Sequence, residues 1–142
     1  MKVSARNVFK GTVSQVQEGS VNAEVVLALP GGESLVAVVT LASVKSLGLV
    51  AGAAAVALVK APWVMLMTEA DDFRLSARNC LEGKVVSVTD GAVNAEVVLE
   101  LPGGAQVYSI VTRHAVQELG LAVGVSATAV IKASHIILGV PK

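Results

Sequence analysis

The segment Ser-Ala-Arg-Asn occurs twice in the chain, at residues 4–7 and again at residues 76–79. Its arginine offers a planar fork of N–H donors and its serine offers a hydroxyl. A Lys-Ala pair also occurs twice, at 60–61 and 132–133, each time after an apolar run. A lysine at the end of an apolar strand is disfavoured unless it has a task. Together these donors suit a tetrahedral oxyanion, a ligand that accepts hydrogen bonds on every side.

These segments recur because the chain is an internal repeat. An offset of 72 residues, the separation of Ser4 from Ser76, aligns the two halves without a gap. The longest match sets GSVNAEVVLALPGG on GAVNAEVVLELPGG. We therefore predict two homologous domains, residues 1–68 and 73–142, with an acidic linker at 69–72.

Each half has the pattern of a small β-domain. β-branched runs on both sides of Pro-Gly-Gly predict a hairpin. A short helix is predicted after Thr40 and after Thr112, because threonine caps helix starts and a glycine follows each helical segment. Gly11 and Gly83 interrupt the first strand, where a small barrel needs a bend or a bulge. The predicted fold class is mainly all-β, with two tandem OB-like small β-barrels that each carry one short helix.

Charge balance and the distribution of apolar residues argue against several classes of function. The 11 basic and 11 acidic side chains cancel, so no net field gathers nucleic acid or an anionic membrane. The apolar stretch at residues 47–67 contains a lysine and a proline, which favours buried strands over a membrane span. The N-terminal residues carry charge before any apolar run, so we expect no secretory signal and a cytoplasmic location.

The rare reactive residues favour binding over catalysis. The lone Cys80 excludes an intrachain disulfide, and we expect a small buried thiol. His114 and His135 have no counterparts in the first half, so we expect no metal-cation site. No catalytic triad, phosphate loop or dinucleotide fingerprint is present, so we expect neither enzyme activity nor a catalytic cofactor.

Structural roles compete with ligand binding for several of these residues. Arg6 and Arg78 could pair with Glu24 and Glu96, which the repeat also keeps, and this reading is as strong as ligand binding. The threonines that precede the helices are better explained as caps than as ligands. The asparagine of each Val-Asn-Ala turn could simply shape the strand entry.

Four recurring motifs, taken as a set, resemble those of the molbindin family. They are SARN near the start, GAVNAEV after the first strand, VVT before a helix that ends in LGL, and KAPW or KAS near the end. Members of this family are Mop-type domains that bind molybdate and tungstate, and the likeness is greatest to a stand-alone member with two such domains. The resemblance implies an OB-like barrel per domain, a trimer of two-domain chains, and molybdate at domain interfaces. It implies that one class of site combines the SARN segment with the lysine segment of a neighbouring domain: Ser4, Ala5, Arg6, Thr40, Lys60, Ala61 and Pro62, with Ser76, Ala77, Arg78, Thr112, Lys132, Ala133 and Ser134.

A second class of site, implied by the same resemblance, lies near the threefold axis at the Val-Asn-Ala turns, formed by Ser20, Val21, Asn22, Ala92, Val93 and Asn94. The function expected from the resemblance is storage and homeostasis of molybdate or tungstate, without catalysis. Two alternatives remain open at this point: an OB-type nucleic-acid module, which would need a basic groove with several stacking aromatics, and a purely structural assembly protein.

Overall fold

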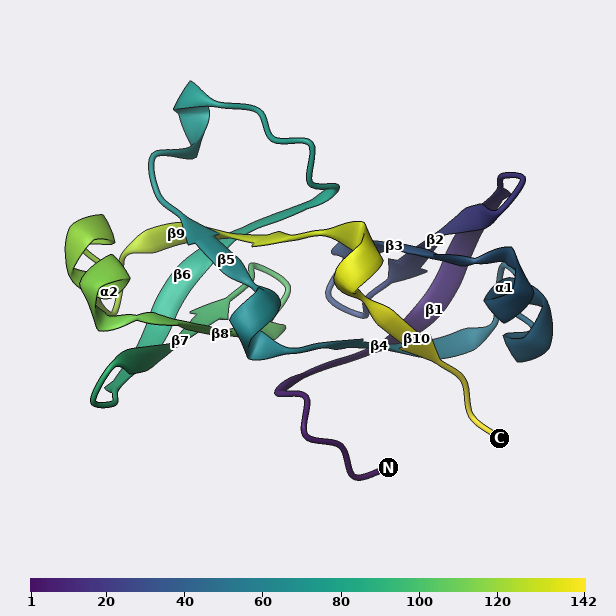
Figure 1. Cartoon of the computed structure of the whole chain (residues 1–142), viewed down its shortest axis with the longest axis horizontal. Helices are drawn as coiled ribbons and strands as arrows, with labels where there is room; N and C mark the ends of the chain where they lie inside the picture. The colour runs from purple at the N-terminus through teal and green to yellow at the C-terminus, as the bar shows by residue number, and fades with distance from the viewer.

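The computed structural model of the chain describes residues 1–142. It contains two five-stranded antiparallel sheets on opposite sides of an elongated molecule (Figure 1). The prediction of a mainly β chain with two OB-like units is confirmed. The strands are β1 (Asn7–Glu18), β2 (Asn22–Ala28), β3 (Ser34–Thr40), β4 (Ala54–Val59), β5 (Met65–Met67), β6 (Asn79–Asp90), β7 (Asn94–Glu100), β8 (Gln106–Thr112), β9 (Ser126–Ile131) and β10 (Ile137–Gly139).

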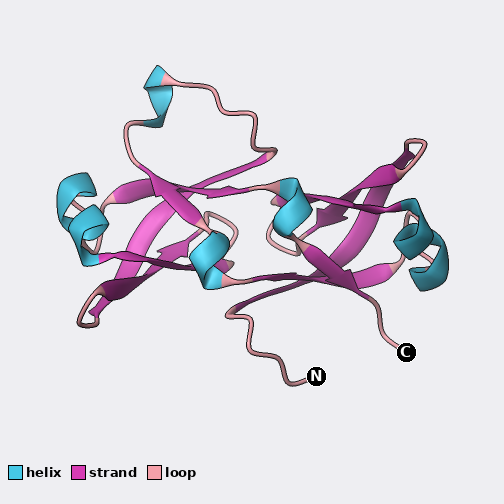
Figure 2. Cartoon of the chain, viewed as in Figure 1, coloured by secondary structure: helices cyan, strands magenta, loops and turns pink.

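Two short α-helices lie at the far ends of the molecule, and short 3-10 turns occupy its centre and the linker (Figure 2). The helices are α1 (Leu41–Leu47) and α2 (Arg113–Leu119). Thr40 and Thr112 cap them as predicted, because each Oγ1 accepts the backbone N–H three residues later at 3.1 Å. Gly48 and Gly120 end them in the left-handed conformation. The 3-10 turns are η1 (Ala61–Trp63), η2 (Ala70–Asp72) and η3 (Ala133–His135).

The last strand of each repeat leaves its own sheet and joins the other one. The first sheet has the order β10-β4-β1-β2-β3, and the second has the order β5-β9-β6-β7-β8. Ile137 therefore pairs with Leu58, and Met65 pairs with Val130. In Figure 1 the yellow strand β10 lies on the purple and blue first half, while β5 lies on the second half. The two sequence repeats are thus interlocked in space.

The apolar stretch at residues 47–67 contains β4, η1 and β5. The prediction of buried strands is met by β4, whose alternate side chains are buried, but not by β5, where Met65 is 60% exposed. No helix of the protein combines the length and apolar character that crossing a membrane requires. Buried residues of both halves join into a single hydrophobic cluster of 25 side chains, which includes Ile136 and Leu138 beside first-half residues such as Val25 and Leu35. The exchanged segments therefore contribute to a shared core.

Two details of the strands differ from the sequence expectations. The irregularities of register lie between Val13 and Gln15 and between Val85 and Ser87, beyond Gly11 and Gly83. Gly11 is needed for a different reason, since a Cβ there would collide with the carbonyl oxygen of Ala28. The expectation of a buried Cys80 is wrong: the thiol is exposed, because strand alternation turns its neighbour Asn79 inward.

Candidate functional site

Strand pairing brings the first SARN segment beside the first Lys-Ala turn. Asn7 at the start of β1 pairs with Val59 at the end of β4, so the residues just before β1 meet those just after β4. Ser4, Ala5 and Lys60 line one hollow of about 170 Å³. Trp63 and His135 also line it, together with apolar side chains. We call this the first central hollow.

The second repeat builds a matching hollow. Ser76, Ala77 and Lys132 line a cavity of about 310 Å³, which we call the second central hollow. Trp63 and His135 line this hollow as well. Their rings lie in a tilted contact with centroids 5.0 Å apart and an interplanar angle of 39°, and both residues lie on the central 3-10 turns. Trp63 and His135 occupy equivalent positions of the two repeats, 72 residues apart, and the structure brings their rings into contact.

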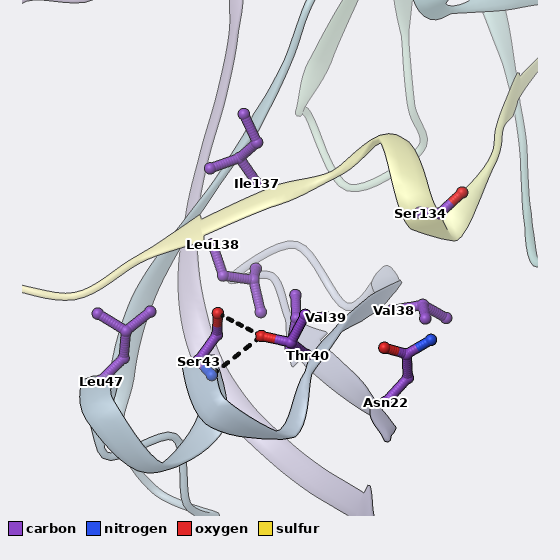
Figure 3. Close-up of a pocket in the computed structure, with 9 residues that line it drawn as sticks. All are labelled: Asn22, Val38, Val39, Thr40, Ser43, Leu47, Ser134, Ile137 and Leu138. Atoms are coloured by element: carbon purple, nitrogen blue, oxygen red, sulfur yellow. Dashed lines mark hydrogen bonds between the residues drawn. The ribbon is translucent and has the colours of Figure 1, made fainter. Parts of the chain in front are cut away.

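A third hollow, of about 380 Å³, lies beside α1 and is the lateral hollow of Figure 3. Its polar groups are Asn22, Thr40 and Ser43 of the first half and Ser134 of the second half. Thr40 Oγ1 lies 2.8 Å from Ser43 Oγ, and it also accepts the Ser43 N–H. Exchange of β10 brings Ser134 to this place, because η3 directly precedes that strand.

Neither SARN arginine lines these hollows, and each pairs with a carboxylate of the opposite half. Arg6 Nη2 lies 3.2 Å from Glu96 Oε1, and Arg78 Nη1 lies 2.6 Å from Glu24 Oε1. The structural alternative, in which the arginines pair with the glutamates of the repeat, is therefore confirmed, but the partners are crossed between the halves rather than Arg6 with Glu24 and Arg78 with Glu96. Exchange of the last strands places the start of each repeat against the other repeat, so the glutamates that the repeat keeps are reached crosswise. Both arginine side chains remain about half exposed, at 52% and 53%.

The SARN asparagines have a role that sequence reasoning missed. Asn7 is buried, and its side-chain amide donates to the Tyr108 carbonyl at 2.8 Å and accepts the Tyr108 N–H at 2.7 Å. Asn79 binds both backbone groups of Val36 in the same way, each at 2.8 Å. The only signal in the sequence was that both asparagines recur, since nothing local indicated which backbone they bind. These amides tie each repeat to the edge strand of the other.

The remaining predicted residues are placed as follows. Ala61 and Ala133 are buried at the start of η1 and η3, whereas Pro62 is exposed. Thr112 caps α2 and lines none of the three hollows. The turn residues of the second class are exposed at the β1–β2 and β6–β7 hairpins: Ser20, Val21, Asn22, Ala92, Val93 and Asn94.

The backbone at these hairpins is paired in the same way in both halves. The carbonyl of Val21 accepts the N–H of Leu41, and the carbonyl of Val93 accepts that of Arg113. His114 lies on α2, with Nε2 3.4 Å from Glu118. No cluster of three or more histidine, cysteine, aspartate or glutamate side chains that could hold a metal ion occurs in the protein.

Comparison with known proteins gives a consistent match for both halves. A family model described as the TOBE domain matches residues 3–66 and again residues 75–138. The molybdenum-pterin-binding protein MopA of Rhodobacter capsulatus is 47% identical over 141 residues, which are 99% of this chain and 53% of that protein. The chain thus spans about half the length of this relative.

Shorter and equally long relatives are also similar. The molybdenum-pterin-binding protein 3 of Clostridium pasteurianum is 48% identical over 64 residues, which are 45% of this chain and 94% of that protein. The crystal structure of the cytoplasmic molybdate-binding protein ModG with molybdate bound superposes with a TM-score of 0.96 at 63% identity. That match covers 99% of this chain and 100% of the other.

Proposed function

This chain belongs to the TOBE domain family, and on that premise we propose that it binds molybdate or tungstate and serves to store and buffer that oxyanion in the cytoplasm, without catalysing a reaction. The observation that supports this most is the match to ModG, which extends over 99% of the chain at 63% identity. The matched crystal structure of ModG contains bound molybdate. ModG is a cytoplasmic protein, which supports the proposed location of this chain.

The donors in the central hollows agree with the chemistry that the proposal needs. Each hollow joins a serine hydroxyl and a lysine ammonium, Ser4 with Lys60 and Ser76 with Lys132. A tetrahedral dianion accepts hydrogen bonds from hydroxyl and ammonium groups without donating any. Arg6 and Arg78 directly follow lining residues of these hollows in the sequence. We propose that their guanidinium groups add charge-assisted hydrogen bonds to the ligand.

We propose further that the sites are completed by assembly of chains, with a homotrimer as the expected form. Trp63, Met65 and Ile137 are large apolar side chains exposed around the central 3-10 turns. Contact between chains would bury them and would bring further donors to the hollows. The lateral hollow, with Thr40 and Ser134, then supplies a surface for a neighbouring chain.

For the second class of site we propose the exposed hairpin turns. Val21 and Val93 are both 71% exposed, and the carbonyl of each accepts the first backbone N–H of the following helix. Three such turns that met at a threefold axis would bury these valines and surround a small ligand with backbone groups. This class requires the oligomer, so its occupancy should be lost in any monomeric variant.

Titration with a panel of ligands tests the proposal. Molybdate and tungstate should bind well ahead of phosphate, because monohydrogen phosphate carries a proton that a pocket of donors cannot accept. Isothermal titration should be run with molybdate, tungstate, sulfate, phosphate and a single-stranded oligonucleotide, and light scattering should give the mass of the assembly. Binding of the oligonucleotide alone would favour the nucleic-acid alternative, and binding of nothing would favour a structural role.

A matched set of lysine variants connects the binding to the hollows. Lys60→Met and Lys132→Met remove the ammonium group from the first and second central hollows. Lys45→Met is the control, because Lys45 is exposed on α1 and lines neither hollow. We expect bound molybdenum per chain to fall in the first two variants and to stay unchanged in the third. Equal uptake in all three would contradict the proposed sites.

A further inference from the structure

The guanidinium of Arg6 is held by two groups of the opposite half. Its central carbon lies 4.8 Å from the centroid of the Tyr108 ring, and Nη2 lies 3.2 Å from Glu96 Oε1. Stacking over the face of an aromatic ring uses none of the five N–H donors of arginine. The carboxylate contact engages one edge of the fork. The stacked guanidinium is therefore oriented while most of its donors remain available.

The SARN segment itself brings Tyr108 to this place. Asn7, the residue after Arg6, binds both backbone groups of Tyr108 at 2.7 and 2.8 Å. Tyr108 lies in the edge strand β8, where it pairs with Val98. The ring is thus fixed at its backbone by the neighbour of the arginine on which it stacks.

The second SARN segment provides an internal control. Asn79 binds both backbone groups of Val36 with the same geometry, so the backbone arrangement is repeated. The position that carries a tyrosine ring in one half carries a valine in the other. Arg78 is therefore held by Glu24 alone, at 2.6 Å.

We propose that Tyr108, with Glu96, is a positioning residue for Arg6, and that the two SARN arginines consequently serve two unequal classes of oxyanion site. This inference rests on the proposed function. A half-exposed arginine loses side-chain freedom when it binds a ligand, and a preformed stack reduces that loss. The class that uses Arg6 binds molybdate more tightly than the class that uses Arg78.

The test first isolates each class of oxyanion site with an arginine variant and then removes or keeps the aromatic ring at position 108. Arg78→Ala leaves the Arg6 class, and Arg6→Ala leaves the Arg78 class. In the Arg78→Ala background, Tyr108→Val should weaken molybdate binding about two- to fivefold, the range of an exposed cation–π contact. Tyr108→Phe in the same background should restore the affinity, since it keeps the ring. In the Arg6→Ala background, Tyr108→Val should leave the affinity unchanged.

The reciprocal variant and a stability measurement complete the design. Val36→Tyr in the Arg6→Ala background should tighten the remaining class, because it supplies the missing ring. Melting temperatures of all variants report any purely structural effect. An equal effect of Tyr108→Val in both backgrounds, or no rescue by Tyr108→Phe, would overturn the inference. If the unmodified protein binds molybdate and only the tyrosine variants fail to behave as expected, the proposed function stands, whereas absence of molybdate binding in the unmodified protein overturns both.

Discussion

The two SARN segments have identical sequences and different surroundings. Asn7 and Asn79 make the same two bonds to a backbone of the opposite half. Arg6 meets a glutamate and an aromatic ring, whereas Arg78 meets only a glutamate. The contacts that join the halves are therefore duplicated, while the contacts around the proposed ligand groups are not. An identical motif does not imply an identical site.

The environments of the two helix caps differ in the same way. Thr40 shares the lateral hollow with Ser43 and Ser134. The residues that correspond to these serines in the repeat are Ala115 and Pro62, and neither carries a hydroxyl. The first-half cap therefore lies in a polar hollow, whereas the positions that correspond to the two serines supply no hydroxyl to its counterpart Thr112. The two repeats thus differ in the polar side chains that accompany their helix caps.

The largest effect is expected where the halves are tied together. Asn7→Ala and Asn79→Ala should each lower the free energy of unfolding by about 2–4 kcal/mol, because backbone groups of the edge strands lose their partners. The Asn79 variant should lose more, since its amide also donates to the Ile131 carbonyl at 3.2 Å. Urea denaturation at one fixed protein concentration measures both.

The control for the asparagines is Ser14→Ala, which removes an exposed bond of 3.3 Å to the Val26 carbonyl. It should change the free energy of unfolding by less than about 0.5 kcal/mol. Losses below about 1 kcal/mol for the asparagine variants would contradict the view that these amides hold the halves together.

The exchanged strands should be unequal in their contribution to stability. Leu138 of β10 is buried, whereas its counterpart Leu66 of β5 is only partly buried. Leu138→Ala should therefore cost about 2–4 kcal/mol of unfolding free energy, and Leu66→Ala should cost less. Thermal denaturation of the two variants makes the comparison. An equal loss for both would mean that the strands are interchangeable.

The arginines should affect binding more than stability. Arg6→Ala and Arg78→Ala should each weaken the affected class of sites by about 1.5–3 kcal/mol, the usual contribution of a hydrogen bond to a charged group. Their exposed ion pairs should contribute at most about 1 kcal/mol to folding. Metal analysis should find a subset of molybdenum lost in each single variant and the whole SARN class lost in the double variant. Unchanged metal in a folded double variant would show that SARN is scaffold.

The smallest effect is expected at the helix caps, where the halves are alike. Thr40→Ala and Thr112→Ala should each cost about 1 kcal/mol of unfolding free energy, since each cap bond measures 3.1 Å. Thr→Ser at either position should retain most of the stability, because serine also caps. The difference in stability between the two alanine variants, measured by urea denaturation, is the quantity that tests whether the caps are equivalent. A clearly larger loss at Thr40 would show that the Ser43 hydroxyl takes part in the cap.

Local features of the fold could be predicted because their causes are local. Helices after Thr40 and Thr112 follow from cap chemistry within seven residues, and each hairpin follows from a Pro-Gly-Gly turn between β-branched runs. The Ser-Ala-Arg-Asn and Lys-Ala residues were expected to share a site only because of the resemblance to the molbindin family. In the structure, antiparallel pairing of β1 with β4 brings Ser4 near Lys60 of the same repeat.

The partners of the arginines could not be predicted in this way. Glu24 and Glu96 are equivalent in the repeat, so the sequence offers two pairings of the same composition and cannot choose between them. The choice depends on which half faces the start of each repeat. The inward orientation of Asn79, and with it the exposure of Cys80, likewise depends on the edge strand of the other half.

By itself the sequence determined that the chain is a twofold repeat of small β-units with a recurring set of donors, because periodicity, turns and caps are properties of neighbouring residues. Only the tertiary structure decided that β5 and β10 change places between the sheets. Either sheet offers these strands an equivalent edge of hydrogen-bond groups, since the repeats are alike, so the local pattern has no preference. The chain crosses from one sheet to the other at η1, between β4 and β5, and at η3, between β9 and β10. That exchange carries Ser134 to the lateral hollow of the first half, and the crossed arginine pairs join the same two halves.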